Sequence, residues 1–262
     1  MRLEMDAAFL SMTPTSAETQ ERWGVLGGLG PLASTEFLKT VYELGAAQKE
    51  QQLPIIYLIS DPSIPDRTQS LLQHNEASLA AALTDRLDTF VYLGIDKIVV
   101  CCMTIHAIFP HLSVDHRERI ISLVDIALSE LIRGEQSALL FATIGTRRSR
   151  LFESHRLWPL AKPFLVFPNE ADQEQIHRLI YEIKSRQRTF DHGAAVIGLL
   201  QHYQVNAFIA GCTEIHVFAK TFLSSPPGES VGCVDPLMTL ATRIVGAKQV
   251  SAVGTQPLNR GK

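Results

Sequence analysis

Short, uninterrupted apolar runs alternate along the chain with longer segments in which apolar residues recur at helical spacing. The runs are typical of buried strands, which we predict at residues 23–29, 54–60, 97–101, 137–144, 163–167 and 205–210. The helical spacing predicts helices at residues 34–47, 75–93, 118–132, 149–157, 172–185, 189–203 and 236–245. Residues 63–68 are polar and predicted to be a loop. Because strands that alternate with helices form parallel sheets, and continuous apolar strands are covered on both faces, the pattern predicts an α/β fold.

The two halves of the sequence repeat one another where strands end. The matching segments are residues 25–30 with 141–146, and residues 97–106 with 207–216. In the second pair a cysteine ends the strand, Cys102 or Cys212, and a histidine follows four residues later. Ligands of open parallel sheets bind beyond the carboxyl ends of the strands. Two such edges that face each other would form a cleft with a thiol on each wall.

This repetition predicts two pseudo-symmetric domains, each a mainly parallel sheet flanked by helices, with the active site in the cleft between them. We expect residues 22–117 together with 217–250 to form the first α/β domain and residues 118–216 to form the second. Residues 1–21 and 251–262 are expected to be loose termini, because they show no clear hydrophobic period.

Composition and charge narrow the class of protein. Of the 262 residues, 46% are hydrophobic and 19% are charged, which excludes a disordered or coiled-coil chain. The net charge of −3 provides no basic surplus for binding nucleic acid or an acidic membrane. No apolar run reaches the roughly 18 residues of a membrane span, and acids near the first residue oppose a signal peptide. We therefore expect a cytoplasmic protein.

Cys102 and Cys212 could serve three kinds of chemistry. A thiolate on one side of a cleft can take a proton from carbon while a thiol on the other side donates one, which inverts a stereocentre. Each cysteine lies where a strand gives way to a predicted helix, and helix N-termini favour the thiolate form of cysteine. Alternatively, the two cysteines could bind zinc together with His106 and His216. Thiol redox chemistry fits less well, because the chain has no Cys-x-x-Cys motif.

The glycine-rich turn after the first strand has two interpretations. Gly28-x-Gly30-x-x-Ala33 formally matches a dinucleotide-binding fingerprint. The match is incomplete, because the second strand ends at Asp61, further from Gly28 than the fingerprint requires, and Pro31 stiffens the turn. The other interpretation is an anion cradle, in which amides at a helix N-terminus contact a carboxylate.

Four motifs in this order resemble the aspartate/glutamate racemase family, and the first two are more similar to its aspartate racemase branch. They are GGLGPLAS at residues 27–34, PSIPDRT at 62–68, Cys102-x-Thr104-x-His106, and GCTE at 211–214. The resemblance covers residues 23–245. It implies a pair of α/β domains, a cofactor-independent racemase that uses two cysteines on an amino-acid substrate, and a homodimer.

The resemblance also implies roles for individual residues. Cys102 and Cys212 would be the acid/base pair, and Arg67 would bind a substrate carboxylate through its planar fork. Thr104, Thr143 and Thr213 match threonines that hydrogen-bond the substrate. The other positions expected at the substrate site are Gly28, Gly30, Pro31, Met103, Lys184 and Glu214. No metal is expected.

One position departs from the family pattern. Met103 replaces the usual asparagine after the first catalytic cysteine, and methionine cannot donate an amide hydrogen bond. The resemblance implies inversion of the α-carbon of aspartate or a closely related dicarboxylic amino acid. Because of Met103 we hypothesise a substituted or less polar analogue of aspartate as the substrate, or a shifted pattern of carboxylate binding. The alternatives are a one-thiol isomerase or decarboxylase of the same architecture, and a non-catalytic or zinc-binding protein that binds amino acids.

Overall fold

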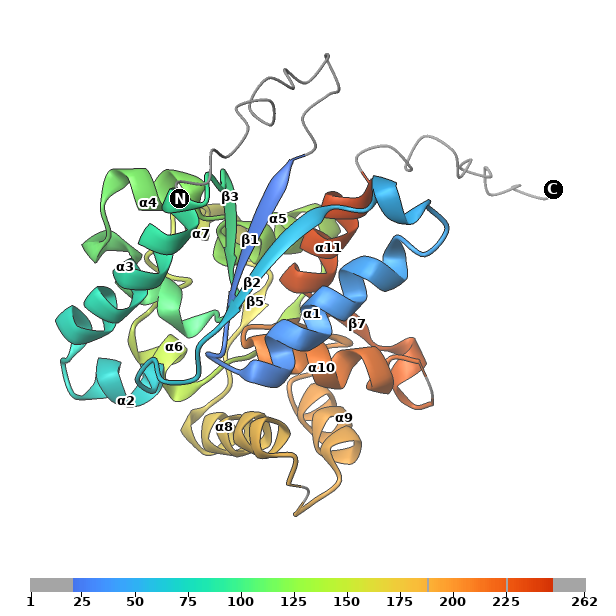
Figure 1. Ribbon diagram of the computed structural model, residues 1–262. Coiled ribbons are helices and arrows are strands. Elements are labelled where there is room, and N and C mark those ends of the chain that lie inside the picture. Colours follow the sequence, from blue (N-terminus) through green and yellow to red (C-terminus); the bar gives the residue numbers. More distant parts are fainter. Residues whose placement is uncertain (1–20, 188, 225, 247–262) are drawn as a thin grey trace, which may run out of the picture.

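The computed structural model describes residues 21–187, 189–224 and 226–246, which form two parallel sheets flanked by helices (Figure 1). The first sheet has the strand order β2-β1-β3 and the second β5-β4-β6-β7. The strands are β1 (Arg22–Gly27), β2 (Ile55–Ser60), β3 (Lys97–Val100), β4 (Ala138–Phe141), β5 (Leu165–Val166), β6 (Ala207–Ala210) and β7 (Gly232–Val234). The predicted fold class is confirmed.

Helices connect the strands and cover the sheets. The α-helices are α1 (Pro31–Leu44), α2 (Arg67–Leu72), α3 (Glu76–Tyr92), α4 (Val114–Arg119), α5 (Leu123–Gly134), α6 (Ile144–Arg148), α7 (Trp158–Ala161), α8 (Glu170–Ser185), α9 (His192–His202), α10 (Thr213–Phe222) and α11 (Pro236–Gly246). Short 3₁₀-helices are η2 (Glu50–Gln52), η3 (Thr104–His111) and η4 (Gly228–Ser230).

Alternate residues of each strand face opposite layers of helices, as a pleated strand requires. In β1, Val25 packs in a core cluster with Phe37 of α1, whereas Leu26 packs in another with Leu83 of α3. Figure 1 shows these two helices on either side of the first sheet. The cluster that contains Val25 also includes Leu140 of the second sheet. The two sheets therefore share one hydrophobic core.

The parallel register gathers the ends of the strands at common edges. Leu26 of β1 pairs with Val100 of β3, so the segments that begin at Gly28 and Cys101 leave the first sheet at the same edge. In the second sheet, Phe141 pairs with Ala210. The residues that follow β4 and β6, including Cys212, therefore leave the second sheet together.

The C-terminal part of the described chain contributes to both halves. Strand β7 extends the second sheet by pairing with β6, whereas α11 packs against α1 and α5. The predicted domain boundaries stay a prediction. The predicted loose termini lie outside the described residues, apart from Glu21.

Two predicted helices differ from the structure. The predicted helix at residues 118–132 is interrupted, because Ile120 forms a bridge with Ile98 and Ser122 then caps the start of α5. Residues 149–157 form turns instead of a helix, and Arg150 among them has a left-handed φ of 53°. In both segments the apolar spacing reflects burial against neighbouring elements rather than one continuous helix.

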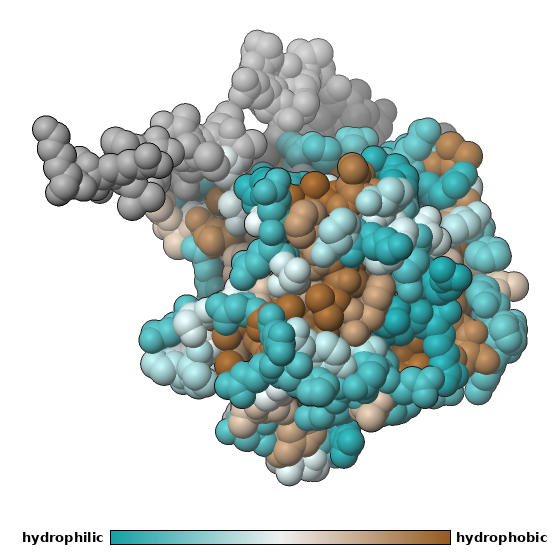
Figure 2. All heavy atoms as spheres, turned by 180° about the vertical axis from the view of Figure 1, so that it is seen from behind, coloured by the Kyte–Doolittle hydropathy of each residue, from teal (hydrophilic) through white to brown (hydrophobic). Residues whose placement is uncertain are grey.

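The surface mixes polar and apolar side chains. Seen from behind in Figure 2, apolar atoms gather in the middle of the face and polar ones surround them. Within the described ranges, no helix has both the length and the apolar character needed to cross a membrane.

Candidate active site

The glycine-rich segment after β1 comes very close to two other parts of the chain. Gly28 has a left-handed φ of 86°, and a Cβ atom there would lie 2.3 Å from the backbone of Asp61. Gly30 precedes Pro31 at the start of α1, and a Cβ atom there would lie 2.0 Å from Oε1 of Glu214. Glycine is required at position 28, where the φ is left-handed and the neighbour is backbone, whereas a side chain at position 30 would have to move the Glu214 carboxylate.

These contacts bring residues from both halves of the sequence around one cavity of about 320 Å³. Six of the predicted substrate-site residues line it: Gly28, Gly30, Pro31, Arg67, Lys184 and Glu214. The rest of the lining is Leu29, Leu32, Pro62, Ile64 and Asp66. Two cations and a buried carboxylate thus face a space that suits a small polar molecule.

Arg67 begins α2, and backbone carbonyls hold its guanidinium in place. The guanidinium donates to the carbonyl oxygens of Ile64 and Pro65 at 3.4 and 3.2 Å, and to that of Leu29. Burial lowers the pKa of Arg67, but interactions with acidic neighbours, Cys102 first among them, raise it overall. The side chain is therefore a fixed positive charge at the cavity wall.

Lys184 reaches the cavity from the C-terminal end of α8. Its Nζ lies 4.0 Å from Oε1 of Glu214 and 4.5 Å from the ring centre of Tyr181. Burial opposes the charge, but Glu214, Cys212 and Cys102 raise the pKa of Lys184 overall. Lys184 is thus a second persistent cation, on the opposite half of the sequence from Arg67.

Tyr181 and Asp66 join the two halves beside the cavity. The Tyr181 hydroxyl donates to Oδ2 of Asp66 at 3.1 Å, while Oδ1 accepts from the backbone N–H of Gln69 and caps α2. Burial raises the pKa of Asp66, but the Gln69 amide and the charges of Arg67 and Lys184 lower it overall. An ionised carboxylate therefore anchors α2 to α8 next to both cations.

Cys212 precedes α10, and its thiol donates to a carboxylate. Its Sγ lies 2.8 Å from Oε2 of Glu214. Glu214 is only 2% exposed, and its Oε1 has no hydrogen-bond partner in the part of the chain that the structure describes. Burial raises the pKa of Cys212 well above its usual value, the charge of Glu214 raises it further, and Lys184 acts in the opposite direction. Cys212 is thus a thiol that retains its proton.

Cys102 follows β3, and its neighbour is a cation. The guanidinium of Arg67 lies within hydrogen-bonding reach of the Cys102 thiol. Cys102 is followed by the 3₁₀-helix η3, which contains Pro110, whereas Cys212 precedes a regular α-helix of ten residues. A helix dipole therefore acts less strongly at Cys102 than the predicted helix implied.

The predicted threonines are buried, lie outside the cavity lining and have partners within the protein. The hydroxyl oxygens of Thr104, Thr143 and Thr146 lie 3.0 to 3.2 Å from one another. Thr213 donates to the carbonyl oxygen of Cys101 at 3.3 Å. These bonds connect η3 and β3 of the first half with α6 and α10 of the second, so they hold the segments around both catalytic candidates together.

Met103 is fully buried and packs in the core shared by the two sheets. It is not part of the cavity lining. Met103 therefore makes no direct contact with a substrate in this cavity. If it alters substrate choice, it does so through the backbone next to Cys102.

The zinc site considered for two cysteines and two histidines is wrong, because both ring nitrogens of each histidine are already engaged. His106 contacts the carbonyl oxygen of Cys102 at 2.9 Å and accepts a backbone amide at 3.1 Å, and burial lowers its pKa to about 4. His216 contacts Asp235 at 2.6 Å and Thr40 at 3.0 Å. Across residues 21–187, 189–224 and 226–246, no three such ligands are grouped for a metal.

Comparison with known families decides the class of protein. The profile of the family described as Asp/Glu/Hydantoin racemase matches residues 26–243. The chain belongs to this family. It is therefore an isomerase of the racemase type, and racemases of this family work without pyridoxal phosphate. The resemblance found in the four motifs is confirmed.

Solved structures of this family share the fold. Picrophilus torridus aspartate racemase is 22% identical with a TM-score of 0.69, and the match covers 86% of this chain and 93% of that one. A putative Asp/Glu racemase from Yersinia pestis is 22% identical with a TM-score of 0.65, covering 86% and 97%. Glutamate racemase from Campylobacter jejuni is 16% identical with a TM-score of 0.56, covering 85% and 84%.

Several residues at the site were not singled out in the sequence. Asp66 and Ile64 belong to the same motif, residues 62–68, as Arg67. Their position next to Arg67 in the sequence is the signal that could have identified them. Thr146 follows the glycine of the repeated strand end. Leu32 and Tyr181 occupy ordinary helix positions, and only the packing of α1 and α8 brings them to the cavity.

Proposed function

We propose that the chain racemises the α-carbon of aspartate or a closely related dicarboxylic amino acid, with Cys102 and Cys212 as its acid/base pair. The observation that carries the substrate class is the charge pattern of the cavity. Arg67 and Lys184 supply two cations, and Oε1 of Glu214 supplies an acceptor that has no hydrogen-bond partner in the described chain, with Lys184 at 4.0 Å from it. Asp66, the other carboxylate of the lining, is already engaged by Tyr181 and Gln69. An amino dicarboxylate presents the complement, two carboxylates and one ammonium group.

Each cation suits one carboxylate for a different reason. The guanidinium of Arg67 is held in place by three backbone carbonyls, and its remaining N–H groups can donate to a carboxylate. Lys184 is a point charge on a flexible stem, which suits the side-chain carboxylate of a substrate whose length can vary. Oε1 of Glu214, which has no hydrogen-bond partner in the described chain, then accepts a hydrogen bond from the ammonium group.

The surroundings of the two thiols support a proton transfer across the α-carbon. In one direction the sulfur of Cys102, as a thiolate, takes the α-proton, and the electron pair of the broken C–H bond stays on the α-carbon. The Cys212 thiol then gives its proton to the opposite face of that carbon and becomes a thiolate. Lys184 and Arg67 offset the negative charge that develops on the substrate. In the reverse direction the cysteines exchange roles.

The test is exchange of the α-proton in heavy water. We expect deuterium at the α-carbon of aspartate, and of glutamate or β-methylaspartate if the cavity accepts a longer or branched side chain, with no exchange in alanine. Mass spectrometry of the recovered amino acid measures it. Exchange that is absent from all three dicarboxylic amino acids would contradict the proposal. Faster turnover of aspartate than of β-methylaspartate would contradict the hypothesis that the natural substrate is a substituted aspartate.

We also propose that the chain forms a homodimer through the edge of the first sheet. Strand β2 pairs only with β1 among the described strands, and its Ile55 and Leu58 are 41% and 38% exposed. An exposed apolar edge strand favours pairing with another chain. Light scattering during size-exclusion chromatography measures the mass, and Leu58→Lys should shift it toward the monomer. A wild-type monomer would contradict this proposal.

A further inference from the structure

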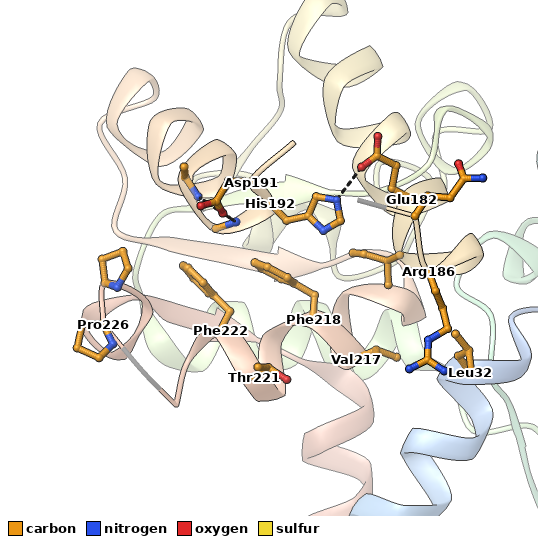
Figure 3. A pocket seen from close by; sticks show the side chains of 15 residues that line it. Leu32, Glu182, Arg186, Asp191, His192, Val217, Phe218, Thr221, Phe222 and Pro226 are labelled. Carbon is orange, nitrogen blue, oxygen red and sulfur yellow. Dashed lines mark hydrogen bonds and ion pairs between the residues drawn. The ribbon is translucent and has the colours of Figure 1, made fainter. Parts of the chain in front are cut away.

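A second cavity, of about 650 Å³, lies on the outer side of the second half of the chain. It is bounded by the C-terminal end of α8, the start of α9, one face of α10, and the loop at Pro226 and Pro227 (Figure 3). Its volume falls in the range of small-molecule sites. Leu32 lines both this cavity and the one that contains Arg67, so the two adjoin at the start of α1.

The floor of this outer cavity is aromatic. Phe218 and Phe222 lie one turn apart on α10, with ring centres 4.9 Å apart and planes inclined by 19°. His192 meets Phe218 edge-on, with ring centres 6.5 Å apart. Figure 3 shows the two phenyl rings side by side below His192. Such a surface offers ring faces and edges to a planar aromatic group.

The wall above this floor is fixed before any ligand arrives. His192 contacts Oε2 of Glu182 at 2.8 Å, and that oxygen also accepts the backbone N–H of Thr189 at 3.1 Å. Asp191 accepts the N–H groups of Gly193 and Ala194 at 2.9 and 3.2 Å. Both acids of the lining are thus engaged within the protein.

Arg186 supplies the one arginine or lysine of the lining. Its backbone N–H donates to Ile183 at 3.3 Å, whereas its guanidinium has no ion pair or hydrogen bond within the described part of the chain. It ends α8 with a left-handed φ of 54°. Figure 3 shows its guanidinium at the end of the cavity where Leu32 and Val217 lie, away from Phe222. An aromatic floor at one end and a free guanidinium at the other define the complementary ligand.

From this arrangement we infer that the outer cavity is a second ligand site, separate from the substrate cavity, that binds a planar aromatic carboxylate. The ring packs against the exposed faces and edges of the Phe218–Phe222 pair, and the carboxylate pairs with Arg186. This site goes beyond the racemase activity, and its occupant would press on Leu32, which also lines the substrate cavity.

Calorimetric titration of the full chain with 2-naphthoate, without any amino acid, tests the site. The matched probe is 2-naphthamide, which has the same ring system and no charge. We expect naphthoate to bind with a dissociation constant of about 1 mM or below, and naphthamide at least about tenfold more weakly. Because no turnover is measured, the outcome does not depend on the proposed racemase reaction.

Two variants assign the binding to this cavity. Arg186→Gln should weaken naphthoate by about tenfold and leave naphthamide unchanged. Arg178→Gln is the control, since Arg178 is an exposed arginine of the same helix outside the cavity lining. Phe218→Ala should weaken both probes, and its thermal unfolding is recorded beside wild type to confirm that it folds. Naphthoate binding that is absent, matched by naphthamide, or insensitive to Arg186→Gln would overturn the inference.

Discussion

Cys102 and Cys212 hold corresponding positions in the two halves of the chain, yet their partners carry opposite charge. The thiol of Cys102 faces the guanidinium of Arg67, and the thiol of Cys212 donates to the carboxylate of Glu214. The backbone repeats itself while the electrostatics does not. At Cys212 the neighbouring carboxylate and burial, rather than the position at a strand end, keep the proton on the thiol by raising its pKa. Four sets of substitutions test this contrast.

Removal of either thiol should have the largest effect. Cys102→Ala and Cys212→Ala should each lower the kcat of racemisation by at least about a thousandfold, because each direction needs one base and one acid. Chiral chromatography of the reaction mixture measures the conversion. Cys233→Ala, at a half-buried cysteine outside the site, is the control. A single mutant with wild-type kcat would contradict the two-base mechanism.

The cation beside Cys102 should come next. Arg67→Gln should lower kcat/KM by about a hundredfold, because substrate binding and the charge next to Cys102 are lost together. Arg67→Lys keeps the charge without the planar guanidinium, so its kcat/KM should lie between those of wild type and Arg67→Gln. The free energy of unfolding is measured in parallel, since the variant also leaves three carbonyls without their donor. If Arg67→Gln kept the wild-type kcat/KM, Arg67 would not belong to the site.

The anion beside Cys212 can be tested without turnover. Glu214→Gln removes a negative charge that raises the pKa of Cys212, so this pKa falls and more thiolate is present at a given pH. Alkylation of Cys212 by iodoacetamide should accelerate by about tenfold near neutral pH. Mass spectrometry of the peptide that contains Cys212 follows the reaction. Glu214→Asp, which keeps the charge, should remain near the wild-type rate, and equal rates in all three proteins would contradict this interpretation.

The histidines of the repeated motif extend the contrast at a smaller scale. His106 lies between backbone groups and burial lowers its pKa from 6.5 to about 4, whereas His216 pairs with Asp235. Between pH 6.5 and about 4, His106 is protonated in the unfolded chain but stays neutral in the folded protein. The free energy of unfolding therefore falls as the pH falls through this range.

His106→Gln should therefore lose about 1 kcal/mol less per pH unit than wild type between pH 6.5 and 4. Urea unfolding at several pH values measures the difference. The exposed His111→Gln serves as the control and should follow wild type. Equal slopes for His106→Gln and wild type would contradict a neutral, buried His106.

The strands and their ends could be predicted because their physics is local. Apolar runs in a parallel sheet are covered on both faces, and this placed Gly28, Cys102 and Cys212 at strand ends correctly. The short helix α2 was missed: the loop predicted at residues 63–68 overlaps its first two residues, and the rest of it received no prediction, since Pro62 and Pro65 disfavour regular structure just before it. Strand β7 was missed, because three residues carry no usable period.

The geometry of the site could not be predicted in the same way. That Glu214 reaches Gly30, or that Tyr181 reaches Asp66, depends on how α1, α8 and α10 pack, and no spacing in the chain encodes it. Sequence reasoning likewise treated Met103 as a surface for the substrate, while the fold uses it to fill the core.

The contact between Gly30 and Glu214 makes two distant motifs a single engineering unit. A side chain at position 30 would expel the carboxylate that accepts the Cys212 proton, and a different residue at position 214 would leave the space beside Gly30 unfilled. A chimera that takes residues 27–34 from a relative should therefore take residues 211–214 from the same parent, so that the space beside position 30 and the side chain at position 214 stay matched.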